Sequence, residues 1–115
     1  MIQPSEVFEF EAVRQSGEQA EAEWLVPSDC PYLDGHFPGQ PVLPAVGMLD
    51  GSLELIRRCG TRLPDGRLSL KKAKFTGVVV PGMKVSVCLL HKENRFDVDW
   101  KSATGELLAT FSFRL

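Results

Sequence analysis

The fold of this 115-residue chain is decided by one stretch of sequence, GHFPGQPVLPAVGMLD at residues 35–50. Three of the eight prolines fall within it, at positions 38, 41 and 44, and each fixes its own φ and pushes the preceding residue out of the helical region. A helix can therefore begin only at Pro44, which suits the first helical position because its missing N–H would have no partner there. The stretch predicts a rigid loop that carries His36 and leads directly into a helix that carries Asp50.

That helix is predicted to run from Ala45 to about Cys59, with Gly60 at its C-terminal stop. Its apolar residues recur at helical spacing and predict one buried stripe, made of Val46, Leu49, Leu53 and Ile56. Asp50 lies four residues after the first of these and three before the third, so the same spacing places the acid on the stripe.

Two glycines in the helix predict a close approach by another group. Gly47 and Gly51 are four residues apart, and each costs roughly 1 kcal/mol relative to alanine inside a helix. We expect either sheet backbone or a ligand to lie against that face.

The remaining sequence predicts strands. Residues 7–13 and 20–26 are two strands that turn at Ser16 and Gly17, and further strands lie near 67–76, 83–91, 95–101 and 106–115. Apolar and polar residues alternate within 95–101, which is typical of an antiparallel strand with one buried face. Two strands, one helix and a four-strand meander predict an α+β fold, an antiparallel sheet of five to six strands wrapped around one central helix.

The bulk properties predict a single domain, residues 1–115, with one core. The net charge is −2 and no run of 18 apolar residues could span a membrane, so we expect a cytoplasmic protein without membrane or nucleic-acid partners. The three cysteines are widely spaced and indicate neither disulfides nor a zinc site. Cys30 is not expected to act as a nucleophile with His36, because Pro31 follows it and nothing marks a third member.

The loop and the helix carry a specific family resemblance. His36-Phe37-Pro38-Gly39, then Pro41, Pro44, Val46 and an acid fourteen residues after the histidine, resembles the 3-hydroxyacyl-(acyl carrier protein) dehydratases of hot-dog fold. Lys74-Phe75-Thr76 and Val79-Val80-Pro81-Gly82 resemble the second characteristic stretch of that family, a strand followed by a Val-Pro-Gly turn. The short chain and its Asp-type acid look most like the compact dehydratases of specialised pathways such as aryl polyene synthesis.

The resemblance implies dehydration of (3R)-3-hydroxyacyl chains to trans-2-enoyl chains on acyl carrier protein, in fatty acid or aryl-polyene-type biosynthesis. It implies that His36 is the base and Asp50 the acid, and that the two come from opposite subunits of a hot-dog dimer. The dimer is expected to be a homodimer or a heterodimer, alone or within a higher oligomer. Oxyanion and substrate contacts are expected from Phe37, Gly39, Ala45 and Val46, and no metal or organic cofactor is needed.

The chemistry of dehydration agrees with these roles. It needs a base for the C2 proton, an acid for the departing hydroxyl group and a donor to the thioester oxygen. An imidazole is a suitable base near neutral pH, and a carboxyl group can be the acid where burial favours its protonated form. Backbone amides at the helix N-terminus, beginning with Ala45, can be the donors, and Gly39 can add another.

Departures from the family pattern keep other functions open. Ala45 stands where the family usually has Gly, Glu54 stands where it usually has Gln, and we expect no counterpart of the N-terminal segment that helps to cover the substrate tunnel. One alternative is a hot-dog acyl thioesterase, which also uses a helix carboxylate. Another is a non-catalytic hot-dog subunit that binds acyl carrier protein or an active partner.

Several residues also have a purely structural interpretation. Asp50 could cap the helix or pair with an arginine. His91 is expected to be solvated at a strand end. Glu54 is expected to form an ion pair with Arg57 or Arg58 on the helix surface.

A basic stretch follows the helix. Seven bases and one acid lie between Arg57 and Lys74. The stretch is either a solvated loop and strand edge or a landing surface for an acidic partner, and acyl carrier proteins are acidic. In the second case we expect Arg57, Arg58 and Lys72 to bind the carrier protein.

Overall fold

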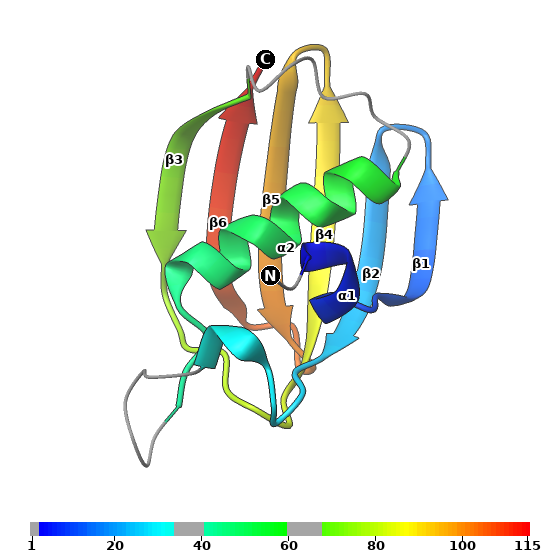
Figure 1. Cartoon of the computed structure of the whole chain (residues 1–115). Coiled ribbons are helices and arrows are strands. Elements are labelled where there is room, and N and C mark those ends of the chain that lie inside the picture. The colour runs from blue at the N-terminus through cyan, green and yellow to red at the C-terminus, as the bar shows by residue number, and fades with distance from the viewer. Residues whose placement is uncertain (1–2, 34–40, 60–67) are drawn as a thin grey trace.

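The computed structural model describes residues 3–33, 41–59 and 68–115, and in this part of the chain one long helix lies across one face of a six-stranded antiparallel sheet (Figure 1). The helices are α1 (Pro4–Val7), the 3₁₀ helix η1 (Pro31–Leu33) and α2 (Ala45–Arg58). The strands are β1 (Glu11–Ser16), β2 (Gln19–Leu25), β3 (Ser69–Phe75), β4 (Lys84–Lys92), β5 (Arg95–Ser102) and β6 (Leu107–Arg114). The predicted α+β fold class is confirmed. None of the described helices is both long and apolar enough to cross a membrane.

The strand order is β1-β2-β4-β5-β6-β3. β4, β5 and β6 form the predicted consecutive hairpins, with Glu93 (φ 52°) and Gly105 (φ 89°) in their turns. The predicted four-strand meander is wrong, because β3 pairs with β6 at one edge while β4 pairs with β2. These pairings join strands that are far apart in the sequence, and the alternation of apolar residues does not specify them.

The first predicted strand, residues 7–13, begins too early. Pro4 starts the short helix α1, and β1 begins only at Glu11. Between them Phe8 is fully buried, with its ring centroid 4.6 Å from that of Trp24. The indole nitrogen of Trp24 donates to the backbone oxygen of Val7 at 3.2 Å, which fastens α1 to the sheet.

The predicted buried stripe on α2 is wrong except at Ile56. Val46 is 54% exposed, and Leu49 and Leu53 are only partly buried. The buried residues of the helix are mainly small or lie on another side: Gly47, Met48, Gly51, Ser52, Glu54, Leu55 and Ile56. Of the four residues predicted for the stripe, Ile56 is fully buried, Leu49 and Leu53 pack only partly against the core, and Val46 is exposed.

The sheet supplies the bulk that α2 lacks on its buried face. Trp100 of β5 is fully buried, and its indole nitrogen donates to the hydroxyl oxygen of Ser52 at 2.9 Å. A Cβ atom added to Gly51 would lie 2.8 Å from Phe8 Cε1 and 2.9 Å from two ring atoms of Trp100. The predicted close approach at this glycine is thus made by aromatic side chains.

Candidate active site

Asp50 is held by a tyrosine that the sequence analysis did not single out. The hydroxyl group of Tyr32, in η1, donates to Asp50 Oδ2 at 2.5 Å, and both side chains are partly buried. Asp50 shares its side of α2 with Val46 and Leu53, so its predicted place on a buried stripe is wrong. The contact that partly shields Asp50 from solvent is made by Tyr32 of η1.

The phenol of Tyr32 stays protonated at neutral pH. Burial, and then the hydrogen bond and the negative charge of Asp50, raise the pKa of Tyr32 far above its ordinary value of 10.0. The phenol therefore remains a donor toward the carboxyl group throughout the physiological range.

The interpretation of Asp50 as the partner of an arginine finds no support in the described residues, where Asp50 takes part in no ion pair. The two arginines that follow it on α2 are both bound to Glu54.

Helix α2 begins at Ala45 as predicted, although Pro44 precedes its first turn and is not the first helical residue. Pro44 is extended (φ −74°, ψ 167°) and caps the helix, which begins at Ala45. The amide of Gly47 donates to the Pro44 oxygen at 3.0 Å. The amides of Ala45 and Val46 come before it, and an α-helix offers no partner to N–H groups in its first turn. Both residues are exposed, so this end of α2 can donate hydrogen bonds to a bound ligand.

The predicted roles of His36, Phe37 and Gly39 lie outside the described residues and stay predictions. The described segments on either side of them meet at α2. A Cβ atom on Gly47 would lie 2.7 Å from Leu43 Cδ1 and 3.2 Å from Tyr32 Cγ. Tyr32 and Leu43, which lie in the described segments on either side of residues 34–40, are therefore both beside the first turn of the helix that carries Asp50.

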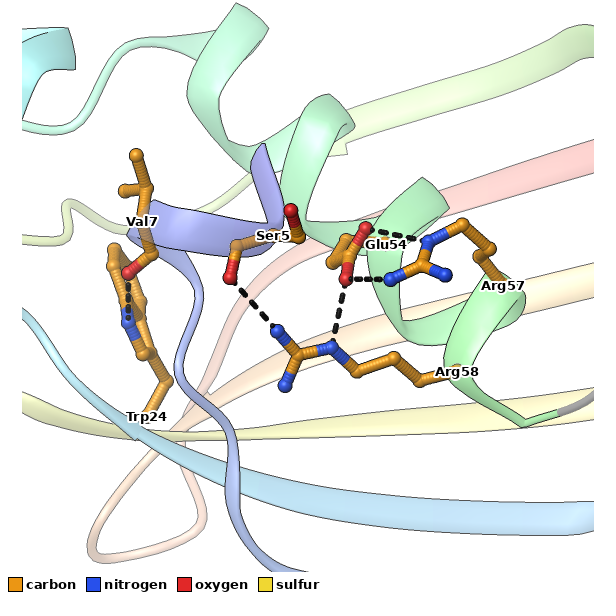
Figure 2. A network of polar contacts seen from close by, with 6 residues as sticks. All are labelled: Ser5, Val7, Trp24, Glu54, Arg57 and Arg58. Atoms are coloured by element: carbon orange, nitrogen blue, oxygen red, sulfur yellow. Dashed lines mark hydrogen bonds and ion pairs between the residues drawn. The ribbon is translucent and has the colours of Figure 1, made fainter. Parts of the chain in front are cut away.

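Glu54 joins α2 to α1 through Arg58 (Figure 2). Its side chain is only 5% exposed and accepts two hydrogen bonds from Arg57, at 2.9 and 2.7 Å, and one from Arg58, at 2.7 Å. Arg58 also donates to the backbone oxygen of Ser5 at 3.1 Å. The hydrogen bond from Arg57, followed by that from Arg58, lowers the pKa of Glu54 despite its burial. The predicted ion pair is confirmed, although its carboxylate is buried.

The three basic residues of the predicted partner surface lie apart. Arg57 and Arg58 are at the C-terminal end of α2, where Gln15 of β1 donates to the backbone oxygen of Cys59 at 3.2 Å. Lys72 lies in β3, at the opposite edge of the sheet (Figure 1). Binding of one partner to all three would therefore span the width of the sheet.

The second histidine, His91, is less exposed to solvent than predicted. His91 lies in β4 and is partly buried, with its ring stacked on Phe96 at a centroid distance of 4.2 Å. Its Nε2 atom lies 3.0 Å from the backbone oxygen of Glu93. These contacts close the β4–β5 turn and do not involve Asp50.

A large cavity lies elsewhere on the molecule. It has a volume of about 880 Å³ and is lined by polar side chains that include Glu21, Asp99 and Lys101. These residues alternate along their strands with core residues such as Trp100, so the cavity opens on the face of the sheet opposite α2. It is therefore separate from the surroundings of Asp50.

Comparison with known proteins decides the family. A family model described as ApeI-like, ApeI dehydratase, matches residues 12–112. The chain belongs to the ApeI-like family. The ApeI-like chain is also 34% identical over 94 residues to the 3-hydroxyacyl-[acyl-carrier-protein] dehydratase FabZ of Anaplasma phagocytophilum, an alignment that covers 70% of this chain and 63% of the relative. It is 36% identical over 74 residues to the FabZ of Chloroflexus aggregans, covering 59% of this chain and 51% of the relative. The chain thus spans between half and two thirds of these relatives.

Solved structures confirm the hot-dog fold. The dehydratase heterocomplex ApeI:P from Xenorhabdus doucetiae matches with a TM-score of 0.78 at 18% identity, covering 93% of the ApeI-like chain and 96% of the other. The dehydratase domain from the CurF module of curacin polyketide synthase matches with a TM-score of 0.69 at 15% identity, covering 93% and 42%. The fold that the resemblance implied is the fold of this chain.

Proposed function

We propose that this ApeI-like protein is a hydro-lyase that removes water from (3R)-3-hydroxyacyl thioesters on acyl carrier protein and yields trans-2-enoyl thioesters. The pathway is of the fatty acid or aryl polyene type. The main observation in favour is the setting of Asp50, a partly buried carboxyl group beside the N-terminus of α2, with a phenol as its partner. Membership of the dehydratase family supports the reaction class.

In the proposed reaction, His36 takes the proton from C2 and the electrons of that C–H bond form the C2–C3 double bond. The C3–O bond breaks, and Asp50 gives its proton to the departing hydroxyl group, which leaves as water. The amides of Ala45 and Gly39 donate to the thioester oxygen, while Phe37 and Val46 contact the acyl chain. Loss of a proton from His36 and uptake of one by Asp50 restore the site.

We propose that a second hot-dog subunit completes the site along β3. All seven residues of this edge strand are exposed. Large apolar side chains in and just after it are also exposed: Leu70 (44%), Phe75 (46%) and Val78 (61%). The outer edge of β3 has no strand beside it among the described residues, and an open strand edge is a template for pairing with another chain. Such a dimer would let His36 and Asp50 of one site come from opposite subunits, as the resemblance implies.

Acyl carrier protein is proposed as the substrate carrier from the names of the relatives and from the basic residues Arg57, Arg58 and Lys72. Arg57 and Arg58 share their charge with the carboxylate of Glu54. Of the three, we therefore expect Lys72 to contribute most to attraction of an acidic carrier.

The test is the interconversion of 3-hydroxybutyryl and crotonyl thioesters by the purified protein, followed by the absorbance of the conjugated enoyl thioester. We expect turnover by the wild type, none by His36→Ala, and a kcat roughly 10²–10⁴-fold lower for Asp50→Asn with KM preserved. His91→Ala is the matched control and should retain wild-type rates, because its contacts are confined to the β4–β5 turn.

Other outcomes separate the alternatives. Activity of His36→Ala within roughly threefold of the wild type would remove His36 from the mechanism. Release of free thiol without formation of enoyl product would indicate the thioesterase. An inactive protein that binds and activates another hot-dog subunit would be the non-catalytic partner.

A further inference from the structure

We infer that Tyr32 is a positioning residue for the catalytic acid: its hydroxyl group holds Asp50 Oδ2 and leaves the other carboxyl oxygen to meet the substrate. This inference rests on the proposed function, because that function gives Asp50 its part in the reaction.

The hydrogen bond between the two side chains has the geometry of a strong contact. Its O–O distance of 2.5 Å is in the range of hydroxyl groups bound to carboxylates. A carboxyl group has two oxygens, and in the part of the chain that the structure describes no hydrogen bond reaches Oδ1. One oxygen of Asp50 is thus held by the protein, and the other is available for proton transfer.

The phenol is supported independently of Asp50. The ring centroid of Tyr32 lies 5.8 Å from that of Phe8, and the absence of a side chain at Gly47 lets the ring approach α2. The η1 turn is closed by the hydrogen bond from the amide of Leu33 to the oxygen of Cys30, at 3.0 Å. A donor that is fixed in this way orients the carboxyl group instead of following it.

The neighbouring residue on α2 that could take this role is occupied. Glu54 is four residues after Asp50, a spacing at which two side chains of a helix can meet. Both of its carboxyl oxygens are bound by Arg57 and Arg58, at the junction with α1 (Figure 2). The acid is therefore oriented from η1.

The hydrogen bond gains strength as the reaction proceeds. When Asp50 gives its proton to the departing hydroxyl group it becomes a carboxylate, and a donor stabilises the carboxylate more than the neutral acid. An interaction that is stronger in the transition state than in the ground state raises kcat. The raised pKa of Tyr32 keeps its proton in place during this step.

The first experiment is a double-mutant cycle with the small thioester substrate. Tyr32→Phe keeps the ring and removes the hydroxyl group, so kcat should fall roughly 10- to 100-fold with little change in KM. In the Asp50→Asn background the same substitution should change kcat less than about twofold, because Tyr32 acts through Asp50. Thr110→Val is the matched control, since it removes a hydroxyl group bound to Asp99 at 2.6 Å on another part of the sheet, and it should leave kcat unchanged.

Two results would overturn the inference. An equal loss in both backgrounds would mean that the hydroxyl group of Tyr32 supports the fold and not the acid. Wild-type kcat for Tyr32→Phe would mean that the acid needs no such support.

The second experiment does not depend on activity. Tyr32 is the single tyrosine of the chain, so tyrosinate absorbance near 295 nm reports on it alone. At about pH 11 an ordinary phenol is mostly ionised, whereas the wild type should show little tyrosinate. Asp50→Asn removes the charge of the carboxylate, so tyrosinate should form at lower pH than in the wild type, and Thr110→Val should follow the wild-type curve.

This titration separates the two ideas under test. Superimposable curves for the wild type and Asp50→Asn would exclude the Tyr32–Asp50 hydrogen bond even in an active dehydratase. A displaced curve in a wild type without dehydratase activity would uphold the hydrogen bond and place the error in the proposed function.

Discussion

Gly51 determines how closely α2 can approach the sheet. Its missing side chain leaves room for Phe8 and for the Trp100 ring, which lie where a Cβ atom would be. Both rings are fully buried, and Trp100 is tied to Ser52 by a hydrogen bond, so neither can move aside easily. The depth at which the helix sits, and with it the height of Asp50 above the sheet, depends on this residue.

We expect Gly51→Ala to lower the stability of the protein. Relief of the helix penalty of glycine favours the substitution by roughly 1 kcal/mol, but overpacking against two fixed rings opposes it by about 1–3 kcal/mol. Thermal denaturation should show a lower Tm than that of the wild type. A higher Tm, the usual result for an exposed glycine in a helix, would contradict the close packing seen here.

The chemistry of single residues could be predicted only in part. The sequence singles out Asp50 because an acid within an apolar helix is conspicuous, although its catalytic role stays a prediction, and the helix glycines predict the close contact that Gly51 makes. Tyr32 was not identified, because its contact with Asp50 depends on where η1 is placed by the fold, and no periodic pattern marks a residue in a short turn. Residues 34–40, which include His36, lie outside the described part of the chain.

Helix α2 is joined to α1 by one buried carboxylate. Glu54 binds both arginines of the last helical turn. Arg58 also donates to the backbone oxygen of Ser5, and its guanidinium carbon lies 5.4 Å from the centre of the Phe10 ring. The C-terminal end of α2 is thus anchored to the N-terminal segment by charge, while its centre is anchored to the sheet by packing.

Glu54→Gln should destabilise the protein by about 1–3 kcal/mol at neutral pH, because the arginines lose their charged acceptor. The pKa of Glu54 is lowered in the folded state from 4.5, so its contribution is complete above that value and is lost as pH falls through the lowered pKa. Urea denaturation should show a lower unfolding free energy for Glu54→Gln than for the wild type at pH 7. This difference should shrink as the pH falls below 4.5.

Glu21→Gln is the control for this effect. Glu21 forms an exposed ion pair with Arg14 at 3.5 Å, and loss of such a pair should change stability by less than about 0.5 kcal/mol. Equal effects of the two substitutions would show that the Glu54 network adds nothing beyond a surface ion pair.

Prediction of whole elements succeeded where the pattern is local. Phe96, Val98 and Trp100 alternate with polar residues and are fully buried in β5, as expected for a strand with one covered face. The apolar spacing of α2 predicted the wrong buried face, because Val46 contributes to the pattern and yet is exposed. The place of β3 beside β6 could not be predicted, since it depends on contacts between residues about 40 positions apart in sequence.

At the scale of the whole molecule, the two edges of the sheet differ in character. β1 forms one edge and is polar except for residues such as Val13. β3 forms the other and combines exposed apolar residues with lysines. Antiparallel self-pairing of β3 about Ala73 would place Lys72 opposite Lys74 of the second copy, and pairing about Lys72 would place two lysines opposite each other. Like charges in such positions are destabilising.

We expect the protein to dimerise through β3, and Leu70→Glu to give an inactive monomer in sedimentation at micromolar concentration. Val13→Glu, at a residue of similar exposure (47% against 44%) on the opposite edge, should leave the dimer intact. Because salt screens repulsion between the lysines, a homodimer should tighten as salt rises, whereas a heterodimer with an acidic partner edge should weaken. An active wild-type monomer would contradict the shared site.

Trp24 and Trp100, the two tryptophans of the chain, meet edge to face with their ring centroids 6.1 Å apart. The first is bonded to α1 through Val7 and the second to α2 through Ser52. Each indole therefore reports optically on the docking of a different helix, without any label. Blue-shifted emission shielded from a soluble quencher marks both helices as seated. Release of α1 alone would shift only the emission of Trp24 to longer wavelength and would make only Trp24 accessible to the quencher. It would also weaken the near-ultraviolet circular dichroism that arises from the coupled pair.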